Sequence, residues 1–117
     1  LQFQDERLHF YHEYHNGLGL VYLKIRQPAE ARGSFFKALK IRDRNAVSHL
    51  GIAESYELQK RYGLSAEYYF LAGSAAITRG QYPIALRSLA ALERLPKGSE
   101  VVSGRIQSLR AILSYNR

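Results

Sequence analysis

Hydrophobic residues recur every three or four positions over long segments of the chain, a spacing that places them on one face of a helix. The first such segment covers residues 1–25, where Leu8, Leu18 and Tyr22 fall on a common face. It stops before Pro28, because proline is accommodated in the first turn of a helix but not in its interior. We therefore expect one long amphipathic helix followed by the start of a second.

The same spacing predicts five further helices. Turn-forming residues separate them, including the polar run 42–45, the pair Tyr62-Gly63 and residues 95–98, while Ser65 and Ser99 are suited to cap a helix. The predicted helices cover residues 28–42, 46–59, 65–78 and 81–94, with a sixth that begins after Ser99. The sixth has a single apolar stripe, typical of a capping helix at the end of an array. The stripe consists of Val102, Ile106, Leu109 and Leu113.

The fourth predicted helix is apolar on more than one side. Tyr68, Tyr69, Phe70 and Leu71 are consecutive, so their side chains point in different directions around the helix axis. A helix with this pattern is buried on several sides. We therefore expect it to lie in the middle of the molecule.

Two consecutive stretches of equal length, residues 12–45 and 46–79, share one pattern of small and aromatic positions. Small residues allow two helices to approach, and aromatic residues fill the space beside the contact. We expect Gly19 to lie where the second helix crosses the first, with Tyr22 and Phe35 on either side, and we assign Gly17 to close packing as well. Identical pairs at equivalent positions are His15/His49, Gly17/Gly51, Tyr22/Tyr56, Phe36/Phe70 and Ala38/Ala72.

The first stretch, with His15, Leu18, Gly19, Tyr22, Ala31, Phe35 and Ala38 at their spacing, resembles the tetratricopeptide repeat family. The resemblance implies an all-α fold, a right-handed α-solenoid of about three helix-turn-helix hairpins. It implies one domain over residues 1–117, with repeats at about 12–45 and 46–79 and a degenerate third unit with a capping helix at about 80–117. Histidine replaces the family's tryptophan at His15 and His49, and Asp43 and Ile77 replace its turn proline. The register of the repeat is ambiguous after Gly80. The residues that follow it also resemble the second half of a repeat, whose first half would be the helix 65–78.

The chain has a formal net charge of +7 and no cysteine, which excludes disulfides and thiolate sites. Its positive charge is concentrated in residues 20–45 and 79–117. No apolar run has the length of a membrane span, and we expect a cytoplasmic protein by default. Since the chain begins with leucine, we interpret it as part of a longer protein.

Residues that suggest chemistry have simpler structural explanations. His9, His12 and His15 are spaced by three residues, which turns them progressively around a helix, so they do not converge on a metal ion. Glu54 and Glu57 form a possible carboxylate pair, but the sequence contains no nucleophile elbow or phosphate loop. We predict that the chain is not an enzyme and needs no cofactor or metal.

The resemblance implies that one helix of each hairpin contributes to a concave surface. The partner-binding residues expected there are Glu13, Asn16, Leu20, Leu23, Lys24, Val47, Leu50, Glu54 and Leu58. We predict a protein-interaction module that binds a peptide or helix of a partner protein, as a scaffold or regulatory part of a larger protein. One alternative is nucleic-acid binding through the basic stretches, which is disfavoured because most aromatics occupy packing positions. The other alternative is an architectural module that self-associates.

Overall fold

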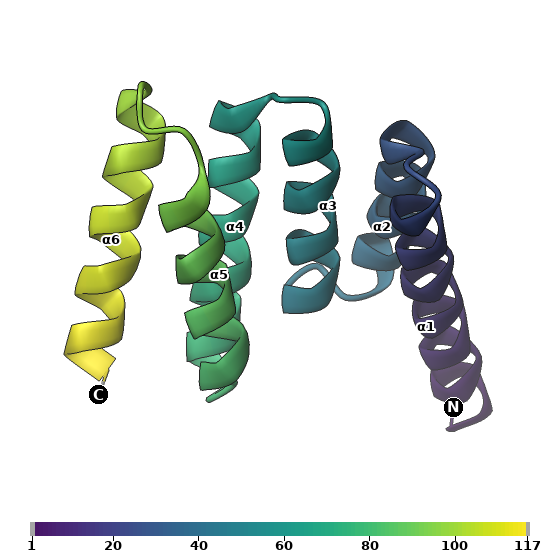
Figure 1. Ribbon diagram of the computed structural model, residues 1–117. Coiled ribbons are helices and arrows are strands. Elements are labelled where there is room, and N and C mark those ends of the chain that lie inside the picture. The colour runs from purple at the N-terminus through teal and green to yellow at the C-terminus, as the bar shows by residue number, and fades with distance from the viewer. Residues whose placement is uncertain (1, 117) are drawn as a thin grey trace.

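The computed structural model describes residues 2–116, with side chains from Glu6 onward; Leu1 and Arg117, at the ends of the predicted domain, lie outside this range. The described part of the chain forms six helices and no strand (Figure 1). Their bounds are α1 (Gln2–Lys24), α2 (Pro28–Ile41), α3 (Ala46–Leu58), α4 (Tyr62–Thr78), α5 (Tyr82–Arg94) and α6 (Glu100–Asn116). The prediction of an all-α fold is confirmed, and the finding holds for these residues.

The helices follow one another in chain order from one end of the molecule to the other, with α5 in front of α4 and the two termini at opposite ends (Figure 1). The molecule measures 46 × 34 × 18 Å, and its shortest dimension is close to the combined width of two packed helices. α1 packs against α2 and α3, while α4 packs against α3, α5 and α6. As predicted, α4 lies in the middle and is covered on several sides, although Leu71 on its outer side stays exposed.

Two close helix contacts involve the residue types that the repeat pattern predicts. The ring of Phe35 on α2 is fully buried between Gly19 on α1 and Gly51 on α3. A β-carbon on either glycine would lie within 3.0 Å of that ring. The prediction for Gly19 is therefore confirmed. The prediction for Gly17 is wrong, because Gly17 is exposed and a β-carbon added to it would meet no atom within 4 Å.

The buried side chains of the described residues form two clusters. The smaller one joins α1, α2 and α3 around Phe35 and Ile52. The larger one joins α3 to α6, and it includes the stripe Val102, Ile106, Leu109 and Leu113 predicted for the last helix. Tyr68 on α4 packs against both clusters, so the core continues along the row of helices.

The helix-to-helix turns after α1, α3 and α4 share one geometry. At the end of each helix one residue adopts a positive φ, namely Arg26 (60°), Lys60 (59°) and Gly80 (71°). The next residue then donates a backbone hydrogen bond to a carbonyl five residues earlier, from Gln27 to Tyr22, from Arg61 to Tyr56 and from Gln81 to Ala76. These are Schellman-type helix ends. Arg26 and Lys60 occupy equivalent positions of the two repeats.

The boundary predictions agree with the structure except at the start of α4. This helix begins at Tyr62 rather than at Ser65, so Ser65 lies inside it and does not cap it. The Ser65 hydroxyl instead donates to the carbonyl of Ala53 on α3 at 2.8 Å. The predicted cap at Ser99 is confirmed, because its hydroxyl accepts from the backbone N–H of Val101 at 3.2 Å. Within the described residues, no helix has the length and hydrophobicity needed to span a membrane.

Candidate functional site

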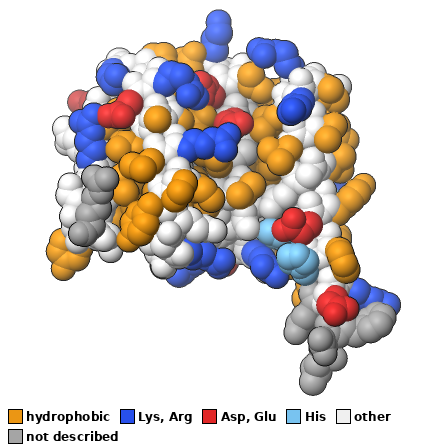
Figure 2. Space-filling model, turned by 60° about the horizontal axis from the view of Figure 1, so that its bottom comes forward, with side chains coloured by type: hydrophobic (Ala, Val, Ile, Leu, Met, Phe, Trp, Pro, Cys, Tyr) orange, Lys and Arg blue, Asp and Glu red, His pale blue; other side chains and the backbone are white. Residues whose placement is uncertain are grey.

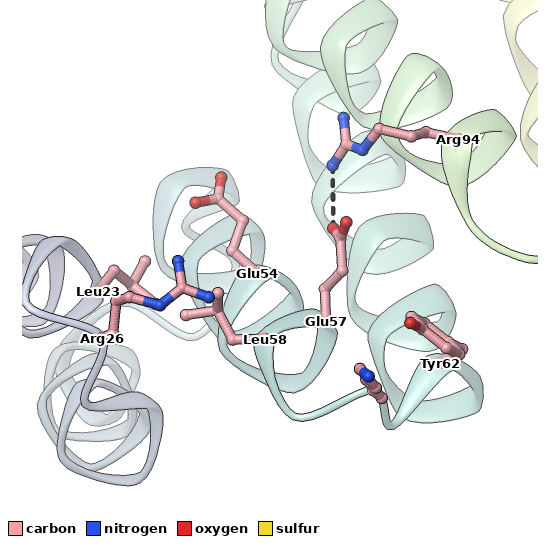
Figure 3. A pocket seen from close by; sticks show the side chains of 8 residues that line it. Leu23, Arg26, Glu54, Glu57, Leu58, Tyr62 and Arg94 are labelled. Carbon is pink, nitrogen blue, oxygen red and sulfur yellow. Dashed lines mark hydrogen bonds and ion pairs between the residues drawn. The ribbon is translucent and has the colours of Figure 1, made fainter.

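A groove of about 430 Å³ lies where the ends of α1, α3 and α5 approach the start of α4. We call it the end groove. Figure 3 shows Leu23 and Arg26 on one side, Glu57, Tyr62 and Arg94 on the other, and Glu54 and Leu58 between them. Its lining residues are Leu23, Arg26, Glu54, Glu57, Leu58, Lys60, Tyr62 and Arg94. The groove thus combines two aliphatic side chains with carboxylates and a cationic rim.

Glu57 is held in place by two donors. The hydroxyl of Tyr69 donates to Glu57 Oε1 at 2.6 Å. The guanidinium of Arg94 donates to the same oxygen at 2.9 Å (Figure 3). Burial of the Tyr69 phenol, together with this bond, raises its pKa far above the ordinary range, so it stays a donor. The hydrogen bond to Glu57 also raises the pKa of Arg94. Glu57 therefore forms a fixed part of the groove wall.

Glu54 is less well compensated. Its carboxylate is half-buried, and the nearest cation is Arg87 on α5, with a side-chain Nη2 to Oε1 distance of 3.7 Å. Burial raises the pKa of Glu54 and Glu57 adds to the rise, while Arg87 and Arg94 act in the opposite direction. A desolvated carboxylate of this kind gains from a second cationic group. Glu54, next to Leu23 and Leu58, is therefore the less tightly paired of the two carboxylates in the groove.

Of the nine partner-binding residues predicted from sequence, Leu23, Glu54 and Leu58 line the end groove. Glu13, Leu20, Lys24 and Val47 are exposed on α1 and α3 but do not line it. The structure therefore brings three of the predicted residues together in a groove and leaves four exposed outside it. The remaining two, Asn16 and Leu50, are buried.

Asn16 was expected on the concave surface, and that placement is wrong. Its side chain connects α1 to the start of α3, because its amide donates to His12 Nε2 (3.3 Å) and its carbonyl oxygen accepts from Ser48 Oγ (2.7 Å). The neighbouring Asn45 caps α3 by accepting from the Ser48 N–H at 2.9 Å. Asn16 is thus part of a buried polar network, where it satisfies groups that would otherwise be unpaired.

Leu50 was also expected on the concave surface, and this placement is wrong as well. It belongs to the larger core cluster, together with Ala46 and Ala53 on the same side of α3. These positions recur at four and three residues, so they form one stripe that faces the core. Glu54 directly follows Ala53 and lies at the edge of this stripe, which leaves its carboxylate half-buried.

The histidines of α1 have separate environments. His9 is exposed, and its Nδ1 lies 3.3 Å from Arg42 Nη2. His12 is buried beside Asn16, with its Nδ1 3.6 Å from Glu13 Oε1, too far for a hydrogen bond. His15 is buried against the rings of Tyr11 and Tyr14. Their distribution agrees with the expectation that successive histidines turn around the helix.

Sequence reasoning missed the cationic and aromatic part of the groove, formed by Arg26, Lys60, Tyr62 and Arg94. One signal was present, since Arg26 and Lys60 occupy equivalent repeat positions at the ends of two first helices. Arg94 could not be placed, because its position depends on how α5 packs after Gly80. Glu57 was considered as a carboxylate neighbour of Glu54, and the structure brings both into the groove.

A second hollow, of about 380 Å³, lies between the start of α5 and the end of α6. It is lined by Tyr82, Leu86, Leu113 and Asn116, and the Tyr82 hydroxyl donates to the Asn116 carbonyl at 3.3 Å. Figure 2 shows hydrophobic side chains gathered on the face that it presents, with Lys and Arg side chains among them. This hollow is more apolar in character than the end groove.

No family model, curated protein or solved structure matches the chain.

Proposed function

We propose that the chain is a non-catalytic protein-interaction module of the tetratricopeptide type, with its helices arranged as a right-handed solenoid. Equivalent turns at Arg26 and Lys60 support a repeated hairpin, as does the packing of Phe35 between Gly19 and Gly51. The carboxylate of Glu57 is engaged by Tyr69 and Arg94, which leaves it poorly suited to act as a general base.

The end groove carries this proposal. Leu23 and Leu58 provide an apolar contact surface, and the carboxylate of Glu54 beside them is not fully compensated by cations. A partner segment that places an aliphatic side chain next to a lysine or arginine would satisfy both features. Since Glu57 is already fixed by Tyr69 and Arg94, part of the groove needs no ordering when the partner binds. The segment would bind as an extended strand or as one face of a helix.

Selection from a phage-displayed library of random peptides tests this function. Enriched peptides should combine aliphatic and basic residues, and their affinity for the chain should fall about tenfold or more in Glu54→Arg and in Leu58→Asp. Val101→Asp is the matched control, because Val101 is an exposed aliphatic residue on α6 away from the groove. Loss of binding in the control, or indifference to both groove variants at unchanged helical circular dichroism, would contradict the proposal.

Self-association is a second candidate, favoured by the hollow between α5 and α6. Leu86 and Tyr82 there are exposed, and a second copy could cover them. Sedimentation velocity over a range of concentrations would detect a dimer, and Leu86→Glu should abolish it. A sedimentation coefficient that stays at the monomer value at all concentrations would exclude this function.

A further inference from the structure

A surface on the α2–α4 side of the molecule carries exposed apolar side chains that neither the end groove nor the core uses. Phe36 on α2 and Leu64 and Leu71 on α4 are 39%, 37% and 41% exposed, respectively. None of them lines the end groove. We call the region defined by these residues and the aromatic cluster beneath them the outer surface.

The aromatic cluster joins three helices. The ring of Tyr68 lies 6.3 Å from Phe36, 6.0 Å from His49 and 5.8 Å from Tyr56, measured between ring centroids. These spacings are typical of packed aromatic pairs. The cluster therefore gives the outer surface a fixed apolar base formed by α2, α3 and α4.

A hollow of about 380 Å³ continues this surface toward the end of α4. His49 and Leu71 belong to both the hollow and the outer surface, and Arg44 and Thr78 lie at its edge. An apolar side chain of a partner could enter here and contact Leu71 and Ala75. The outer surface thus has a place for an anchor as well as exposed apolar area.

The charge around the outer surface is positive. Arg32 and Arg61 lie over the ring of Tyr56 at 4.3 and 5.1 Å from its centroid. Two further cations lie around this surface, namely Lys40, one helical turn after Phe36, and Arg44. Within residues 6–116 no carboxylate forms an ion pair with any of these four cations.

Four arginines elsewhere in the described residues, by contrast, are paired with carboxylates. Arg87 and Arg94 pair with Glu54 and Glu57, Arg105 pairs with Glu67 at 2.7 Å, and Arg110 pairs with Glu93. Asp43 is the acidic residue that lines the hollow. The outer surface therefore combines apolar anchoring area with positive charge for which the described residues provide few counter-charges.

We propose that the outer surface docks an acidic segment of a partner protein that carries aliphatic or aromatic anchor residues. Arg32, Lys40, Arg44 and Arg61 would attract its carboxylates, while Phe36, Leu64 and Leu71 would contact its anchors. We proposed a basic segment for the end groove, so the two surfaces would select partners of opposite charge. This inference does not depend on the function proposed for the end groove.

A protein segment fits the outer surface better than single-stranded nucleic acid does. Nucleobases stack on open aromatic faces, but Tyr56 has two guanidinium groups over its ring and Tyr68 is surrounded by three other rings. Leu64 and Leu71, which supply much of the exposed apolar area, offer no face for stacking. Carboxylate-bearing peptides need only the charges and the aliphatic contacts.

The test uses the whole chain and the same random peptide library, with each enriched peptide then synthesised and titrated by fluorescence anisotropy. A class of peptides rich in Asp and Glu with apolar anchors should be enriched. Their affinity should fall about tenfold or more in Leu71→Asp and in the double variant Lys40→Glu/Arg44→Glu. Val101→Asp, at an exposed aliphatic residue on α6, is the matched control for Leu71→Asp and should leave these peptides unaffected.

Two results would overturn the inference. One is a selection without acidic peptides, or with acidic peptides indifferent to Leu71→Asp and to the double variant while circular dichroism shows intact helices. The other is a short oligouridylate that binds the chain, competes with the peptides and loses affinity in the double variant, which would make the surface a nucleic-acid site. Because the three substituted side chains lie outside the buried clusters, these substitutions leave the core unchanged. If the end groove does not bind peptides, this would be seen separately, because basic peptides would not be enriched or their affinity would not fall in Glu54→Arg.

Discussion

Phe35 sets the distance between three helices, because its buried ring touches the backbone of Gly19 on one side and of Gly51 on the other. Its ring occupies the space that two side chains would otherwise fill. Glycine at these two positions is therefore required by close approach, although it lowers the intrinsic stability of a helix. Ala31 and Ala38 on α2 are likewise fully buried, which keeps that helix close to its neighbours.

Substitution of Gly51 tests this packing. Gly51→Ala would place a β-carbon within 3.0 Å of the Phe35 ring, so we expect a loss of about 1–3 kcal/mol in the free energy of unfolding. Gly17→Ala is the control, because a β-carbon there meets no atom within 4 Å, and it should add about 0.5–1 kcal/mol through helix propensity. Urea denaturation followed by circular dichroism measures both, and a Gly51→Ala variant as stable as Gly17→Ala would contradict the packing argument.

Buried histidines make stability depend on pH. Burial lowers the pKa of His12 below 6.5, its value in an unfolded chain, and the positive charge of Arg42 lowers it further. Between the lowered value and 6.5 the unfolded state binds more protons than the folded state, so the free energy of unfolding rises with pH in this window. It should fall as the pH drops below about 6.5 and stay constant above about 7.5.

Urea titrations at about pH 7.5 and about pH 5.5 measure this effect. In His12→Gln, where an amide oxygen can still accept from Asn16, the decrease in stability at low pH should be smaller. Part of it should remain, because burial also lowers the pKa of His15 and of His49. An equal pH dependence in the variant and the parent chain would show that His12 does not contribute.

At the scale of the helices, the sequence predicted most boundaries because local signals decide them. Pro28 marks the start of α2, and Ser99 caps α6. The start of α4 was not predictable in this way. Ser65 is a good capping residue, but its hydroxyl bonds the Ala53 carbonyl across the helix interface, and the helix begins one turn earlier. A tertiary hydrogen bond thus took the place of the local one.

The positive φ at Arg26 and Lys60 carries a steric cost that Gly80 avoids. We expect Lys60→Gly to raise the free energy of unfolding by up to about 1 kcal/mol, since glycine relieves the strain but loses more entropy on folding. Gly80→Ala should lower it by about 1 kcal/mol. Lys60→Ala, which removes the charge but keeps the strain, is the control for the first substitution. Urea midpoints that rank Lys60→Ala at or above Lys60→Gly would contradict the role assigned to φ.

At the scale of the whole molecule, the repeat pattern predicted only part of the candidate site. Leu23, Glu54 and Leu58 were predicted from it and line the groove, but Leu20 and Lys24, which lie 34 residues before Glu54 and Leu58, do not. Leu50 and Arg94 depend on the packing of the later helices instead. The turn at Gly80 has the same geometry as the turns that follow α1 and α3, the first helices of their hairpins. The helix α4 therefore ends like a first helix, although it is the second helix of the α3–α4 hairpin. This double role of α4 could not be predicted from a pattern that covers only the two repeats.

The continuous row of helices leads to a prediction about how the molecule unfolds. α6 contacts α4 and α5, and Leu109 is fully buried against Gly73 of α4. Leu109→Ala removes this contact and should lower the free energy of unfolding by about 2–5 kcal/mol, whereas Val101→Ala, on the exposed side of α6, should lower it much less.

Because α1 and α2 pack in a separate cluster around Phe35, the loss of stability should affect the two ends of the molecule unequally. Amide hydrogen exchange should accelerate in α5 and α6 of Leu109→Ala before it does in α1 and α2. Equal acceleration in all helices would mean instead that the two clusters unfold as one cooperative unit. Tyr68 and α3, which contact both clusters, would then couple their stabilities.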